Sequence, residues 1–298
     1  MTTRFGEVIT AMVTPFETDG RLDVKGARSL AAHLVDHGSQ GLVVCGTTGE
    51  SPTLSHNEKL TLFENVVEEV GDRAKVIAGT GTYDTEESKH LTREACARGV
   101  DACLVVTPYY SKPPQGALLE HFRAVADAST VDVMIYDIPG RTGRRVERGT
   151  MVELASHDRI VAVKDAVGDP SETARLRADL DAARASDFEI YSGDDILLLP
   201  LLAAGAVGIV SVCSHLVGDR MRELFRAWPS DAGEARRIYL ELIPLFDVIM
   251  GLTTSPIPVK AALAMVGIEV GRLRPPLIEA TDEQKATIRA ALERAGVL

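Results

Sequence analysis

The sequence predicts an α/β fold, specifically a (β/α)8 TIM barrel with a C-terminal helical extension. Eight short apolar, β-branched runs recur, most of them starting 27 to 34 residues after the previous one, and the stretches between them show helical periodicity. Continuously apolar strands that alternate with helices are typical of a parallel sheet, and eight such units can close a barrel. The runs span residues 8–13, 41–46, 75–80, 102–107, 132–139, 160–166, 188–195 and 206–213.

The first two segments between strands illustrate the helical pattern. Gly38 follows an apolar series with i, i+3, i+4 and i+7 spacing, at residues 27, 30, 31 and 34, and supplies the stop. Ser55 and Glu58 form a capping box that predicts the start of the second helix. Its apolar side ends at Gly71 and contains residues 62, 63, 66, 67 and 70.

The alternation stops beyond Pro229, after a final strand spacing of only 18 residues. Three further helical segments, at roughly 232–250, 256–266 and 282–295, have no strand partners. We therefore expect two domains, a catalytic barrel over residues 1–230 and a C-terminal α-helical domain over residues 231–298.

Composition narrows the classes of function. The formal net charge of −11 argues against binding to nucleic acid or to an anionic membrane, so the expected partners are small molecules or copies of the chain. The four cysteines form no CxxC pair and the N-terminus lacks a signal-peptide pattern, which fits the cytoplasm. The uncharged run 196–213 is long enough for a membrane span, but Pro200, Gly205 and Gly208 interrupt it. A buried helix that leads into a buried strand explains the same run.

The predicted strands end in polar residues, at the face where barrels of this kind carry their active sites. Lys164 is the one lysine that ends a buried strand, and burial lowers the pKa of an amine unless the amine is paired. Pairing with Asp165, Asp194 or Asp195 would give it a structural role instead. The polar residues at the predicted strand ends are Thr14, Thr47, Thr48, Thr80, Tyr109, Tyr110, Tyr136, Arg141, Lys164, Asp165, residues 192–195 and Ser211.

Tyr136 on the neighbouring strand favours a chemical role for Lys164. A neutral amine that forms an imine with a ketone requires a proton donor for the departing water, and a phenol facing Lys164 can carry that proton. The GTTGE sequence at 46–50 can hold a carboxylate with backbone N–H groups and hydroxyls, or can be a simple tight turn. Arg141, in a loop that begins at Pro139, suits a second carboxylate because its guanidinium can bind two oxygens.

Other sequence patterns point to no further chemistry. His33 and His37 have the helical spacing of zinc ligands but lack a third ligand, so we predict no metal site there. GTGTYD at 79–84 has only two glycines of a dinucleotide-binding pattern and is expected to be a barrel turn. YSGDD at 191–195 occupies a common phosphate position, but its two aspartates would repel phosphate.

The combined motifs resemble the dihydrodipicolinate synthase (4-hydroxy-tetrahydrodipicolinate synthase) family over almost the whole chain. They are GTTGE (46–50), the YY of TPYYSKPP (107–114), YDIPGRT (136–142), the lysine of VAVKDA (161–166), YSGDD (191–195) and SPIPVK (255–260). The YSKPP and DIPGR sequences are similar to those of the actinobacterial branch of the family. The resemblance implies condensation of pyruvate with L-aspartate 4-semialdehyde, towards diaminopimelate and lysine, in a cofactor-free homotetramer built from two tight dimers.

The resemblance also implies roles for individual residues. Lys164 would form the Schiff base with pyruvate, and Tyr136, Thr47 and Tyr110 would form the proton relay, with Tyr110 contributed by a neighbouring subunit. The remaining substrate contacts would come from Thr48 for the pyruvate carboxylate, Arg141 for the semialdehyde carboxylate, and the backbones of Gly193 and Val210 beside the lysine.

Some family members are inhibited by lysine at a dimer-interface cleft, and the resemblance places Ser51, His56, Lys59, Tyr83 and Glu87 there. Inhibited bacterial enzymes tend to carry a histidine and an asparagine where this chain has Lys59 and Tyr83. Because a cation at position 59 opposes binding of a cationic effector, the sequence predicts weak or absent feedback.

Three alternatives share the predicted barrel. N-acetylneuraminate lyase has the same lysine, but Arg141 and the second threonine of GTTGE favour the synthase. A sensor that binds metabolites without converting them has no need of a proton relay. A phosphate-binding isomerase is disfavoured by Asp194 and Asp195.

Overall fold

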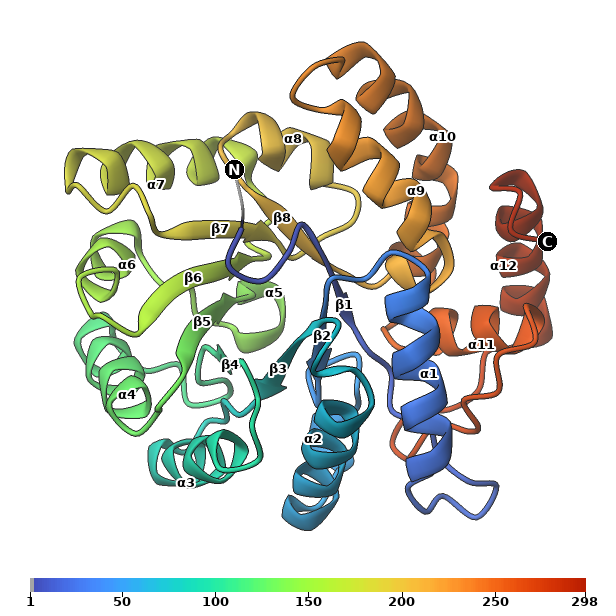
Figure 1. The fold of residues 1–298 in the computed structure, drawn as a ribbon, viewed down its shortest axis with the longest axis horizontal. Coiled ribbons are helices and arrows are strands. Elements are labelled where there is room, and N and C mark those ends of the chain that lie inside the picture. Colours follow the sequence, from blue (N-terminus) through green and yellow to red (C-terminus); the bar gives the residue numbers. More distant parts are fainter. Residues whose placement is uncertain (1–2) are drawn as a thin grey trace.

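The computed structural model describes residues 3–298 and contains a closed barrel of eight parallel strands in sequential order (Figure 1). Helices surround this barrel, which confirms the predicted (β/α)8 architecture. The strands are β1 (Val8–Ala11), β2 (Gly41–Val44), β3 (Lys75–Gly79), β4 (Ala102–Val106), β5 (Asp132–Asp137), β6 (Ile160–Asp165), β7 (Glu189–Ser192) and β8 (Gly208–Ser211).

The helices cover the outside of the barrel and form the C-terminal extension. They are α1 (Val24–Asp36), α2 (His56–Val70), α3 (Thr85–Cys96), α4 (Gln115–Asp127), α5 (Pro139–Thr142), α6 (Arg148–Leu154), α7 (Pro170–Ala182), α8 (Leu198–Ala203), α9 (Ser214–Ala227), α10 (Ala232–Gly251), α11 (Ile257–Met265) and α12 (Asp282–Arg294), with a 3-10 turn, η1 (Ser51–Thr53).

Local signals behave as the sequence predicts. The capping box of Ser55 and Glu58 starts α2, and Gly38 takes a left-handed φ of 100° just beyond α1. The run 196–213 becomes α8 followed by β8, and no helix in the described part of the chain is long and apolar enough to cross a membrane. The strands are shorter than the expected runs, most clearly the seventh and the eighth, which span four residues each, and the fifth ends before α5 begins at Pro139.

Two apolar cores hold these layers together. Side chains that point into the barrel form one core, and the residues between the strands and the surrounding helices form the other. The inner core includes Ile9, Val43, Ile77, Leu104, Met134, Ala162, Tyr191 and Val210. Since the interior is packed with side chains, a substrate can bind only at one end of the barrel.

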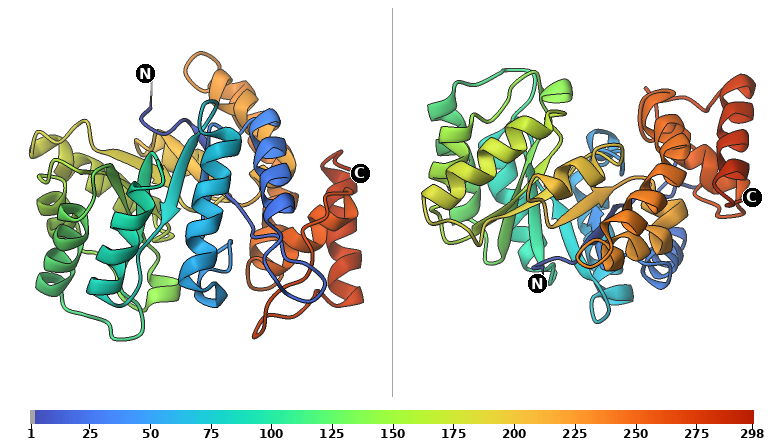
Figure 2. Two further views of the ribbon diagram at one scale, coloured as in Figure 1. Left: turned by 60° about the horizontal axis from the view of Figure 1, so that its bottom comes forward. Right: turned by 90° about the horizontal axis from the view of Figure 1, so that it is seen from above.

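The C-terminal helices gather at one side of the barrel (Figure 2). Helix α10 packs against α9 and α12, and α11 packs against α12. A buried ion pair connects this extension to the GTTGE loop, since Lys260 Nζ of α11 lies 2.7 Å from Glu50 Oε1. The extension therefore reaches the carboxyl end of β2, where the sequence places part of the site.

Candidate active site

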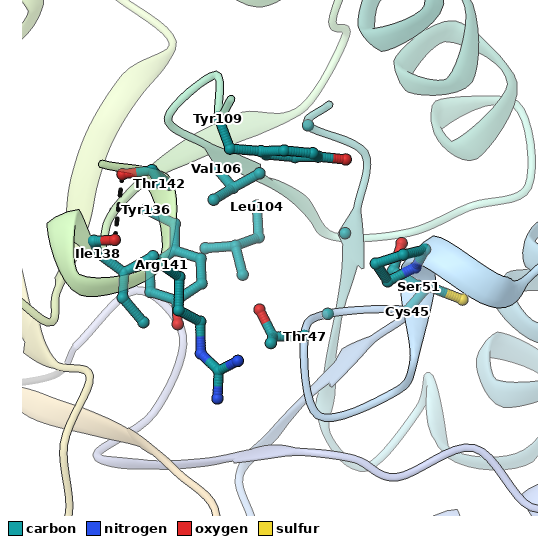
Figure 3. A pocket seen from close by; sticks show the side chains of 14 residues that line it. Cys45, Thr47, Ser51, Leu104, Val106, Tyr109, Tyr136, Ile138, Arg141 and Thr142 are labelled. Atoms are coloured by element: carbon teal, nitrogen blue, oxygen red, sulfur yellow. Dashed lines mark hydrogen bonds between the residues drawn. The ribbon is translucent and has the colours of Figure 1, made fainter. Parts of the chain in front are cut away.

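A cavity of about 220 Å³ opens at the carboxyl ends of β2 to β5 (Figure 3). It is lined by Thr47, Tyr136 and Arg141 from the predicted site, and also by Tyr109, Ser51 and apolar residues that include Leu104, Val106 and Ile138. Figure 3 shows the Thr47 hydroxyl and the Arg141 guanidinium reaching into the space beside Tyr136. The cavity thus combines an apolar wall with a few polar groups that converge on it, as small-molecule sites do.

Lys164 lies beside Tyr136, because the two residues are register partners on β6 and β5. The Lys164 ammonium sits 4.3 Å from the centre of the Tyr136 ring, and the side chain is only 5% exposed. Burial lowers the pKa of Lys164 to about 8, against the opposing effect of Asp195. The barrel therefore holds an amine that is deprotonated far more readily than an exposed lysine.

No described residue forms an ion pair with Lys164. The neighbouring carboxylates have other partners: Asp165 accepts from the Thr173 hydroxyl at 2.6 Å, and Asp195 accepts from the Ser211 hydroxyl at 2.5 Å and from the Val212 N–H at 3.0 Å. The structural alternative, a lysine buried as part of a salt bridge, is wrong for residues 3–298. What remains is a desolvated amine beside a phenol.

Tyr136 can supply the proton that imine formation requires. Burial raises the pKa of this phenol to about 12, while Arg141 and Thr47 act in the other direction. The phenol therefore stays protonated at neutral pH, so a proton is available on it for a reaction at the neighbouring amine.

The GTTGE sequence forms a tight turn that presents unpaired backbone donors. Within residues 3–298, the N–H groups of Thr47 and Thr48 have no hydrogen-bond acceptor, while the Thr47 carbonyl accepts from Glu50 N–H at 3.1 Å. Thr14 stabilises the turn, because its hydroxyl donates a hydrogen bond to the Gly49 carbonyl at 2.6 Å. The turn interpretation is therefore correct, and the turn leaves two backbone donors free; their binding of a carboxylate stays a prediction.

Among the three arginines of the 139–145 loop, Arg141 faces the cavity. Arg144 donates to the Lys112 carbonyl at 2.9 Å, and Arg145 pairs with Glu172 at 2.5 Å. Arg141 has no ion pair among the described residues and lines the cavity, so its guanidinium is available to an anion.

Gly193 leaves the space that the Lys164 side chain occupies. A Cβ atom at this position would lie 2.8 Å from Ala166 Cβ and 3.1 Å from Lys164 Cγ. Val210, in contrast, is a buried member of the inner core. Backbone contact of either residue with a substrate remains an expectation from the resemblance.

We expect Gly193→Ala to lower kcat/KM for the condensation that the resemblance implies, on the order of a hundredfold. The added methyl group would displace the Lys164 amine, and a misplacement of about 1 Å has an effect of that size. Gly116→Ala is the matched control, since its Cβ would meet no atom within 4 Å. Steady-state kinetics on both folded variants checks this, and equal activity of the two would contradict the expectation.

The single chain does not bring Tyr110 to Lys164. Tyr110 is 92% exposed, has a left-handed φ of 70°, and does not line the cavity. Several predicted strand-end hydroxyls also have internal partners instead of facing the cavity. Thr80 accepts from Thr92 at 2.8 Å, and Ser211 binds Asp195.

Two of the residues grouped by the resemblance as an effector cleft, Ser51 and Tyr83, lie at the cavity. Ser51 lines it, and the exposed Tyr83 ring packs edge-on against Tyr109 at 5.2 Å between ring centres. His56 and Glu87 contact each other at 3.2 Å between α2 and α3.

Sequence reasoning missed the buried anchor of the GTTGE loop, formed by Glu50, Lys260 and Arg274. Glu50 has a left-handed φ of 56°, binds Lys260 through one carboxylate oxygen, and accepts the Arg274 N–H at 2.9 Å through the other. The sequence offers two signals for this anchor, the charged Glu50 at the end of GTTGE and Lys260 in an apolar helix. They are more than 200 positions apart, so the sequence does not show that they pair.

Comparison with known proteins identifies the family. Residues 4–295 match the model of the dihydrodipicolinate synthetase family. The chain belongs to this family. The 4-hydroxy-tetrahydrodipicolinate synthase of Moorella thermoacetica is 51% identical over 99% of this chain and 100% of that protein.

Solved structures of the family superpose along the whole chain. The Cyanidioschyzon merolae enzyme, solved with lysine bound, has a TM-score of 0.94 and 42% identity, covering 100% of both chains. The Acinetobacter baumannii enzyme, solved in complex with pyruvate, has a TM-score of 0.93 and 34% identity, covering 99% of this chain and 100% of that chain.

Proposed function

We propose that this chain is a lyase that condenses pyruvate with L-aspartate 4-semialdehyde, as a 4-hydroxy-tetrahydrodipicolinate synthase. The observation that carries the proposal is the buried Lys164 amine, which lies against the Tyr136 ring and has no ion-pair partner within residues 3–298. The full-length curated relatives carry that enzyme name, and the N-acetylneuraminate lyase alternative is not favoured by them. The reaction belongs to diaminopimelate and lysine biosynthesis.

The first step uses Lys164 as the nucleophile. Its neutral amine attacks the keto carbon of pyruvate, and the resulting carbinolamine loses water to give the imine, with Tyr136 donating the proton that the departing hydroxide needs. Thr47 and Thr48 hold the pyruvate carboxylate through their N–H groups, and the Thr47 hydroxyl extends the relay from Tyr136. The Tyr136 phenolate then takes a methyl proton from the protonated imine, which gives an enamine whose carbon attacks the aldehyde of the second substrate.

The experiment offers pyruvate with L-aspartate 4-semialdehyde in one reaction and with N-acetylmannosamine in another, and follows pyruvate consumption. Consumption with the semialdehyde alone supports the synthase. Consumption with the sugar would move the chain to the lyase reaction, and consumption with neither would favour a metabolite-binding barrel.

Arg141 is proposed to bind the carboxylate of the semialdehyde. We expect Arg141→Ala to raise KM for the semialdehyde roughly tenfold to a hundredfold, since a hydrogen bond to a charged group contributes about 1.5–3 kcal/mol. Imine formation with pyruvate should persist in this variant. Arg144→Ala is the control, because the Arg144 guanidinium binds the Lys112 carbonyl instead. An unchanged KM in Arg141→Ala would contradict the assignment.

We propose that the active enzyme is a homotetramer, a dimer of dimers, in which Tyr110 completes the relay of a neighbouring subunit. The 92% exposure of Tyr110 supports this, since a single chain leaves the side chain unused. Sedimentation would reveal the assembly, and a fully active monomer would contradict the shared relay. We also propose that the protein is cytoplasmic and of the actinobacterial subtype. The proposed boundary between the catalytic barrel and the C-terminal α-helical domain lies between residues 230 and 231.

Lysine feedback is proposed to be weak or absent. Lys59 lies three residues after His56 on α2, and in the expected cleft of Ser51, His56, Tyr83 and Glu87 its charge would repel a cationic amino acid. Activity measured with millimolar lysine should stay close to the uninhibited rate, and strong inhibition would overturn this proposal.

A further inference from the structure

A second cluster of chemically active side chains lies outside the cavity, between α2 and α3. His56 begins α2, while His90 and Glu94 are one turn apart on the same face of α3. Glu94 Oε2 lies 2.5 Å from His56 Nε2 and 3.2 Å from His90 Nε2, and the two imidazoles are stacked with ring centres 5.0 Å apart. In the described part of the chain, no other three His, Cys, Asp or Glu residues bring their ligand atoms within 4.8 Å of one another.

We propose that His56, His90 and Glu94 form a binding site for a divalent transition-metal ion, with Zn²⁺ as the best-fitting cation. Two imidazoles and one carboxylate are a common zinc ligand set, usually completed by water in the fourth position. Imidazole ligands favour Zn²⁺, Cu²⁺ or Ni²⁺ over Mg²⁺ and Ca²⁺, which prefer oxygen ligands.

Two of the three distances between ligand atoms already suit a bound ion, and all three atoms lie within 4.8 Å of one another. Ligands about 2.0–2.1 Å from a tetrahedral ion stand roughly 3.3 Å from one another. The contact between His90 and Glu94 already has this spacing, and the hydrogen-bonded contact between His56 and Glu94 opens slightly when the ion replaces its proton. All three side chains are partly exposed in the single chain, at 29%, 59% and 32%, so an ion can reach them there from solvent.

Neighbouring residues contact His56 and Glu94 and orient their side chains. In known metal sites, hydrogen bonds around the ligands have the same effect. Glu87 Oε1 lies 3.2 Å from His56 Nδ1, and a hydrogen bond donated by Nδ1 leaves Nε2 for the metal. Arg98 approaches the other oxygen of Glu94, Oε1, at 3.8 Å, so Oε2 remains available. The sequence does not reveal this set, because His56 is separated from His90 by a strand and most of two helices.

The test titrates ZnCl₂ into the chelator-treated full chain, without substrates, by isothermal calorimetry and by thermal unfolding. We expect one ion per chain in the micromolar range and a rise in Tm, since a ligand that binds only the folded state stabilises it. MgCl₂ should produce neither effect. Because no substrate is present, the result is independent of the proposed reaction.

His90→Ala and Glu94→Gln should each weaken Zn²⁺ binding at least tenfold, and His90 is exposed enough for its variant to fold normally. The control is His33→Ala, which alters the chain's other stacked histidine pair, His33 and His37, with ring centres 4.0 Å apart. Binding that survives His90→Ala, or that disappears in His33→Ala, would overturn the proposal. So would the absence of binding by the unmodified chain.

Discussion

Replacing Lys164 with alanine is expected to lower pyruvate consumption on the order of a thousandfold or more, because the nucleophile itself is removed. Borohydride added with pyruvate should trap a covalent adduct on the unmodified chain, detected as one reduced pyruvate per chain by mass spectrometry. The variant should show no adduct. Lys89→Ala is the matched control, since Lys89 forms only a surface ion pair with Glu86.

The same amine predicts a pH dependence. Below its pKa of about 8 Lys164 is protonated and cannot attack, so kcat/KM for pyruvate should rise with pH and level off above about 8. At pH 7, one unit below that value, roughly a tenth of the chains carry the neutral amine. A pH-independent rate between 6 and 8, or an adduct that persists in Lys164→Ala, would exclude Lys164 as the nucleophile.

Replacing Lys260 with methionine is expected to destabilise the chain by about 3–5 kcal/mol, the usual effect of leaving a buried charge without its partner. Glu50 and Lys260 are 2% and 3% exposed, and burial lowers the pKa of Lys260. Lys260 Nζ also donates to the Arg272 carbonyl at 3.0 Å, so the variant loses a second contact. Urea unfolding measures the change in free energy.

The double variant Glu50→Gln with Lys260→Met should lose less stability than the sum of the single changes, because it leaves no unpaired charge. Arg237→Ala serves as the control, since its exposed ion pairs with Glu234 and Glu241 contribute at most about 1 kcal/mol. Strict additivity of the two single effects would show that the ion pair does not couple the C-terminal extension to the GTTGE loop.

Several site residues were predictable because position along a strand determines position in a barrel. Lys164 and Tyr136 end neighbouring runs, and the parallel register places them side by side. Arg141 and Thr47 follow their strands by a few residues and therefore reach the same cavity. Tyr110 follows a strand as well, but an exposed, left-handed residue shows that strand order alone does not fix the direction of a loop side chain.

The sequence by itself determined the eight βα units, the capping box at Ser55, the C-terminal helices and the candidate nucleophile, because periodicity, turn residues and burial act locally. Only the tertiary structure decided which charges are paired. It showed that Lys164 has no ion pair among the described residues while the equally buried Lys260 binds Glu50. It also brought His56 to His90 and Glu94. These contacts join residues far apart in the chain, and only the closed barrel and its packed helices bring them together.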